Sequence, residues 1–178
     1  MSAEIRRVAI FGVLALILGG YTYVTMPEKK AIGANAAKKT DQSVLEFSLD
    51  KVKHINVVFE GKHLVCQRTP QGWVNSSSGA SVRQDVVVDF LTNLQKLLNL
   101  GAVEIEEAQL SDFGLRPPVS RIMLEVEGEE TRILSLGKNN PVQTSLYAQI
   151  NENPQVVLVG SVVTWDIRKL FTAAGFAG

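Results

Sequence analysis

The chain has 178 residues, of which 46% are hydrophobic, 20% charged and 7% aromatic. This length corresponds to about one domain of ordinary size, and the composition is too apolar for a disordered chain. The 18 lysines and arginines equal the 18 acidic residues in number, which argues against a nucleic-acid partner, because phosphate contacts need a basic excess. The single cysteine, Cys66, cannot form an internal disulfide, and two histidines leave little material for a metal site.

An apolar segment lies near the N-terminus, where basic side chains outnumber acidic ones. Residues 8–20 contain no polar side chain. Extended to residue 26, the run would span roughly 28 Å as a helix, close to the ~30 Å hydrocarbon thickness of a bilayer. Residues 8–26 are therefore predicted to form a single transmembrane helix in contact with the lipid bilayer. Gly12 and Gly19 lie seven residues apart on one side of that helix and are candidates for packing against a partner helix.

A cleaved signal peptide is the alternative interpretation of this segment. The small-x-small pattern at residues 34–36 has the form of a cleavage site, but it lies behind Lys29 and Lys30 and far beyond the apolar run. An uncleaved anchor is therefore favoured. Residues 1–7 are predicted to be a cytoplasmic tail, residues 27–43 a flexible polar stalk, and residues 44–178 an extracytoplasmic domain.

In the first half of this domain, apolar residues recur at every second position, and then at the spacing of a helix. Residues 52–59 are predicted to form a strand, residues 63–68 its hairpin partner and residues 73–75 a short third strand. Ser81 and Gln84 match a capping box. An apolar stripe at helical spacing follows, formed by Val87, Phe90, Leu91, Leu94, Leu97 and Leu98.

The second half repeats this order. Strands are predicted at residues 119–126, 131–136, 146–150 and 156–159, with a loop at residues 137–141 and a last helix at residues 164–171. Similar turns at residues 59–62 and 126–129 indicate two related ββ-plus-helix halves as one interpretation, although two short matches are weak evidence for a repeat. The predicted fold class is α+β: an N-terminal transmembrane helix, then a mainly antiparallel sheet with two helices packed on one face.

The sequence contains no recognisable catalytic motif. His63 and Cys66 have opposite parity on a strand, so they point to opposite faces. The acidic residues alternate with apolar ones, as on a solvated strand face; they are Glu104, Glu106, Glu107, Glu125, Glu127, Glu129 and Glu130. A glycosidase-like pair or a calcium site is the alternative for these carboxylates. No catalytic residue, cofactor or metal is predicted.

Several short motifs resemble a family of bacterial domains of unknown function that often accompany gliding-motility-type ABC transporters. These motifs occupy residues 71–73, 110–119, 133–141 and 145–150, and their order and spacing match. The matching residues expected to have structural roles are Trp73, Phe113, Gly114, Pro117, Gly137, Pro141 and Tyr147. The resemblance names no catalytic residue. It implies one N-terminal span in the bacterial inner membrane and a periplasmic domain.

The predicted function is that of a non-enzymatic, membrane-anchored accessory or scaffold subunit of a larger membrane assembly, with an ABC-type transport system as the favoured assembly. Its expected partners are integral-membrane subunits. A stand-alone periplasmic binding domain for an envelope polymer, a lipid or a small ligand is the alternative. A hydrolase that uses the acidic face is a third interpretation.

Overall fold

The computed structural model describes residues 42–176. The two α-helices of this part are α2 (Gln84–Gln95) and α3 (Val162–Ala173), and the short 3-10 helices are η1 (Leu49–Lys51) and η2 (Glu107–Gln109). The strands are β1 (Val52–Phe59), β2 (Lys62–Thr69), β3 (Gly72–Asn75), β4 (Ser81–Val82), β5 (Gly101–Val103), β6 (Ser120–Val126), β7 (Arg132–Asn139), β8 (Ser145–Ile150) and β9 (Val156–Gly160).

All nine strands belong to one antiparallel sheet. The strand order is β4-β3-β2-β1-β6-β7-β8-β9-β5. Two meanders, β1 to β4 and β6 to β9, are joined where β1 pairs with β6, from Val52 opposite Val126 to Phe59 opposite Ser120. The short strand β5 returns to the far edge and pairs with β9. The central β1–β6 pairing makes the two meanders one continuous structure.

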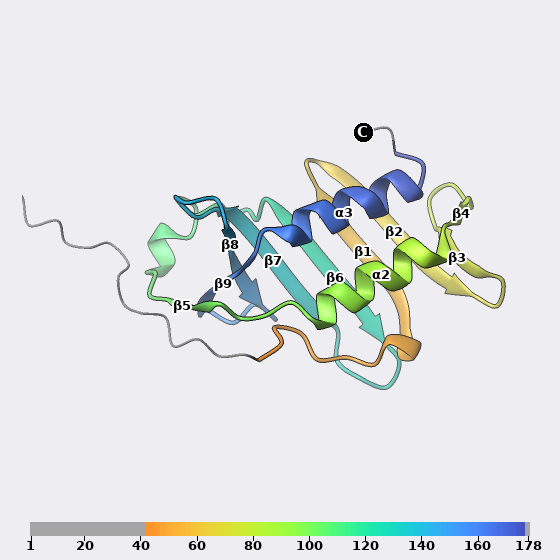
Figure 1. Ribbon diagram of the computed structural model, residues 1–178, viewed down its shortest axis with the longest axis horizontal. Coiled ribbons are helices and arrows are strands. Elements are labelled where there is room, and N and C mark those ends of the chain that lie inside the picture. The colour runs from red at the N-terminus through yellow and green to blue at the C-terminus, as the bar shows by residue number, and fades with distance from the viewer. Residues whose placement is uncertain (1–41, 177–178) are drawn as a thin grey trace, which may run out of the picture. The chain divides into compact units, whose positions relative to one another are not determined.

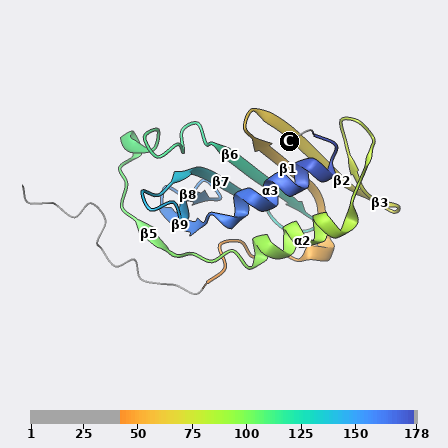
Figure 2. The same cartoon turned by 45° about the horizontal axis from the view of Figure 1, so that its top comes forward.

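Both α-helices cover the same face of the sheet (Figures 1 and 2). Alternate strand residues point toward them and are buried, such as Ile55 in β1, Ile122 in β6 and Leu134 in β7. Phe90 of α2 and Leu170 of α3 fill the layer between helices and sheet. The strand period of two and the helical period of 3.6 place their apolar residues on the same layer, and this layer forms the main core.

The predicted fold class requires correction. The described chain is mostly one nine-stranded antiparallel sheet with two short helices, in place of a transmembrane helix followed by two ββ-plus-helix halves. None of the helices within residues 42–176 is long and apolar enough to cross a bilayer. Residues 8–26, with Gly12 and Gly19, lie outside the described residues, as does most of the predicted stalk. Ser43, assigned to the stalk, already bonds through its hydroxyl to the Gln95 carbonyl.

Two local predictions are also wrong, and one strand was not predicted. Helix α2 begins at Gln84 after Arg83, so Ser81 is not its N-cap; instead Ser81 and Val82 form β4, because Val82 pairs with Trp73 and is buried. Strand β7 continues to Asn139 through the predicted loop. The strand that was not predicted is β5, whose three residues begin at a glycine.

Candidate functional site

The face of the sheet opposite the helices is partly covered by the segment of residues 104–119, which we call the cover segment. It contains η2 and the whole of the longest motif described above, residues 110–119. Its apolar residues form a second, smaller core with the sheet, built from Leu110, Leu115 and Val156 with Ile105, Phe113 and Tyr147 packed around them. The Phe113 and Tyr147 rings meet edge to face, with centroids 4.7 Å apart. The cover segment is therefore packed onto the sheet.

Two glycines allow this close approach. At Gly137, in β7, an added Cβ atom would lie 2.3 Å from the Phe113 carbonyl oxygen, so only glycine fits. The next residue, Lys138, donates its backbone N–H to that same carbonyl at 2.8 Å. Gly114 has a φ of +68°, which other residues adopt only with strain. These contacts give Phe113, Gly114, Gly137 and Tyr147 one shared role: they seat the cover segment on β7 and β8.

The other predicted motif residues lie elsewhere. Trp73 is buried at 2% exposure on the helix-covered side, with the Arg68 guanidinium 6.0 Å from its ring. Pro117 follows a cis peptide bond after Arg116 at the margin of the cover segment. Pro141 is exposed in the loop between β7 and β8. The motif thus marks several parts of the fold, and of these predicted residues Pro117 also lines a separate feature.

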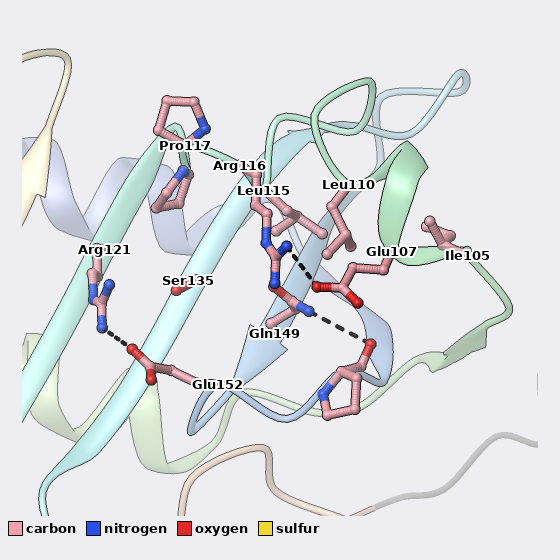
Figure 3. A pocket seen from close by; sticks show the side chains of 12 residues that line it. Ile105, Glu107, Leu110, Leu115, Arg116, Pro117, Arg121, Ser135, Gln149 and Glu152 are labelled. Atoms are coloured by element: carbon pink, nitrogen blue, oxygen red, sulfur yellow. Dashed lines mark hydrogen bonds and ion pairs between the residues drawn. The ribbon is translucent and has the colours of Figure 1, made fainter.

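That feature is a groove of about 570 Å³ between the cover segment and the exposed part of the sheet. Its apolar wall and rim consist of Ile105, Leu110, Leu115, Pro117, Pro118 and Pro154. Its polar residues are Glu107, Arg116, Arg121, Ser135, Gln149 and Glu152, shown in Figure 3. The volume lies within the range of small-molecule and peptide-side-chain sites.

A row of hydrogen-bonding side chains crosses the floor of the groove. Arg121 of β6 is the register partner of Ser135 of β7, and Ser135 is the partner of Gln149 of β8. Residues directly opposite in antiparallel strands have Cβ atoms about 4.5–5.5 Å apart on the same face. We call these three residues the donor row. Figure 3 shows Arg121 and Ser135 on neighbouring strands, with the Arg116 side chain on the same side as Gln149.

The charges of the groove are paired but unequally exposed. Arg121 bonds through Nη2 to Glu152, and Arg116 bonds through Nη1 to Glu107 at 2.7 Å. The Arg121 side chain is 33% exposed, whereas that of Glu152 is 64% exposed. The Arg121 Nε is buried and has no hydrogen-bond partner within the described residues. In the first of these pairs, the Arg121 charge therefore lies on the floor and the Glu152 charge on the rim, whereas Arg116 and Glu107 are both exposed, at 60% and 75%.

The residues considered for catalysis do not form an obvious reactive centre. Burial raises the pKa of the Cys66 thiol to about 12, which keeps it protonated and unreactive at neutral pH. His63 bonds to Asn56 on the helix-free face, and Cys66 points into the core. Several carboxylates of the predicted acidic face pair with cations, as Glu127 does with Lys53 at 2.9 Å. Within residues 42–176, no three histidine, cysteine, aspartate or glutamate side chains lie close enough to hold a metal ion.

The sequence did not reveal the groove. Arg121, Ser135 and Gln149 fall within predicted strands, but no catalytic or binding pattern distinguishes them in the sequence. One signal was available: in each strand, the polar residue alternates with apolar residues and so points away from the apolar face. The structure shows that these three strands are neighbours. Recognising the row required the register, which the sequence alone does not provide.

Comparisons with known proteins give one match. Residues 73–164, just over half of the chain, match the family model described as domain of unknown function DUF4340. This range includes the cover segment, the donor row and every residue that lines the groove. Neither the curated proteins nor the solved structures include a match to the chain. The chain belongs to the DUF4340 family of domains of unknown function.

Proposed function

We propose that this protein is a non-enzymatic accessory or scaffold subunit of a membrane assembly, and that a partner subunit binds across the helix-free face of its sheet. The observation that carries the proposal is the groove, because all of its lining residues fall within the family-matched range. A surface used for recognition combines apolar contact area with a few oriented polar groups. The groove has both.

Exposed apolar area continues beyond the groove. Val58 of β1 is the register partner of Arg121 and is 40% exposed. Val119, at the end of the cover segment, is also exposed. Together with the apolar wall, these side chains give a partner a contact area that extends past the donor row. Exposed apolar side chains around a hollow are typical of protein-interaction sites.

The membrane setting rests on the sequence. The apolar run of residues 8–26 supports attachment to the bacterial inner membrane, with the folded domain in the periplasm. The resemblance to domains that accompany gliding-motility-type ABC transporters supports an ABC-type transport system as the assembly. The expected partners are its integral-membrane subunits.

A stand-alone binding domain is the second candidate, and the size of the groove favours it. A hollow of about 570 Å³ suits a small ligand, a lipid headgroup or part of an envelope polymer as well as a partner side chain. In that case the protein would act without a stoichiometric membrane partner.

Purification from detergent-solubilised membranes separates the two. We expect the full-length protein to retain integral-membrane subunits in a fixed ratio. Val58→Lys should lose them, because it places a second cation beside Arg121 and removes apolar contact. Val88→Lys is the matched control, since Val88 is similarly exposed, at 44%, on α2. Absence of stoichiometric partners would contradict the proposal in favour of the stand-alone domain. Equal retention of partners by both variants would contradict binding across the helix-free face.

A further inference from the structure

We infer that the groove recognises a carboxylate of a peptide chain, held by the donor row with an adjacent apolar side chain on the wall of the cover segment. This inference rests on the proposed function and gives the partner a chemical identity. It follows from which groups line the floor, how deeply they lie, and which internal group already occupies the site.

The floor of the groove provides hydrogen-bond donors in a line. A guanidinium carries five N–H groups, a serine hydroxyl one O–H and a glutamine amide two N–H groups. Only one of the Arg121 N–H groups has a partner within the described part of the chain, and that partner is Glu152. The Ser135 hydroxyl makes no hydrogen bond there. The Gln149 amide already donates through Nε2 to the carbonyl oxygens of Asn153 and Pro154, at 3.3 and 3.5 Å. Arg121 and Ser135 thus offer unused donors to a ligand that brings acceptors.

The chain itself shows which acceptor fits. Glu152, in the β8–β9 turn, places a carboxylate oxygen on Arg121 from the rim. Its side chain is mostly exposed, and its backbone has a φ of +59°, which a non-glycine residue rarely adopts. An exposed ion pair of this kind adds little stability. An incoming carboxylate can therefore replace Glu152 and form a two-pronged contact with the guanidinium, which is stronger than a single bond.

The neighbouring surface indicates a peptide in preference to a small free acid. Leu110 and Leu115 are buried beneath the groove, and Ile105 adds a half-buried side chain beside them. A free small carboxylate would leave this wall unused. A carboxylate at a chain end or on an acidic residue, with an apolar neighbour, contacts both surfaces at once.

The test is a titration of the full chain with three short probes, followed by nitrogen-15 NMR and calorimetry. The probes are acetyl-Ala-Leu-Leu with a free C-terminal carboxylate, the same peptide as its amide, and acetyl-Leu-Glu-Leu-amide. We expect the free acid or the glutamate peptide to bind and to shift the Arg121 Nε–H and Gln149 side-chain signals. Which of the two binds identifies the carboxylate as terminal or side-chain. Binding of the amide with equal affinity, or binding of acetate alone as tightly as the peptide, would overturn the inference.

Variants make the result specific to the donor row. Arg121→Gln should weaken binding about tenfold or more, the loss expected for a charge-assisted hydrogen bond. Arg83→Gln is the control, because Arg83 also pairs with a carboxylate, Asp85, but lies on the exposed surface before α2. Glu152→Gln should strengthen binding, because it removes the competing carboxylate while leaving Arg121 in place. Unchanged or weaker binding by Glu152→Gln would contradict the inference even if Arg121→Gln did not fold.

The two proposals fail in different ways. If no carboxylate peptide binds but Val58→Lys still loses the membrane partners, the carboxylate assignment is wrong and the accessory function stands. If the peptides bind as expected and no stoichiometric membrane partner is found, the donor row is a binding site in a stand-alone domain. The accessory function is then wrong.

Discussion

The two faces of the sheet are closed in different ways. On one face, α2 and α3 lie across the strands, and residues such as Ile55, Leu134 and Phe90 are almost completely buried. On the other face, the cover segment closes only one end and leaves Val58 exposed and Arg121 and Gln149 half-buried beside the buried Ser135. The first face is a continuous apolar layer that supplies most of the folding energy. The second face combines packing with polar groups that remain available to bind a partner.

The two tryptophans test the first half of this comparison and should show the largest effect. Trp73 is 2% exposed, so Trp73→Ala should lower the free energy of unfolding by about 3–5 kcal/mol. Trp165 is 64% exposed on α3, so Trp165→Ala should change it by less than about 0.5 kcal/mol. Urea denaturation of the domain measures both. Equal effects of the two substitutions would show that the helix-covered layer does not dominate stability.

Two glycines test the packing of the cover segment. Gly137→Ala would place a Cβ atom 2.3 Å from the Phe113 carbonyl oxygen, and we expect a loss of about 1–3 kcal/mol together with movement of the cover segment. Gly160→Ala is the control, because its Cβ atom would meet nothing closer than 3.9 Å, at Val162 Cγ1. Chemical-shift changes at Phe113 and Tyr147 report the movement. If both variants are equally stable and unshifted, the close approach at Gly137 is not required.

The smallest expected effect is a pH dependence on the helix-covered side. Burial raises the pKa of Asp166, against the opposing effect of its hydrogen bond from Asn93. A raised carboxyl pKa in the folded state means that this group favours folding at low pH. That contribution is lost as the pH rises through the raised pKa. Asp166→Asn should therefore become more stable relative to wild type as the pH rises above about 4, the ordinary carboxyl pKa. A difference between the two proteins that is constant with pH would contradict this assignment.

The sequence predicted the strands well where side-chain alternation and turn residues agree, as at residues 52–59 and 120–126. The prediction failed where contacts between residues far apart in the sequence determine the secondary structure. Val82 joins an edge strand because it pairs with Trp73, although the local pattern favours a helix start. Gly137 continues β7 because the Phe113 carbonyl lies against it, although a glycine ahead of two asparagines and a proline indicates a loop. The groove depends on register across three strands, and no local pattern specifies that register.

Cross-linking in intact cells most directly tests the central claim that the helix-free face is the recognition surface. A photoreactive benzoylphenylalanine replaces either Val58 on the helix-free face or Val88 on α2. The two valines are similarly exposed, at 40% and 44%, and lie on opposite sides of the sheet. The account predicts a discrete product with an integral-membrane protein from position 58 and none from position 88. A product from position 88 alone, or none from position 58, would contradict it.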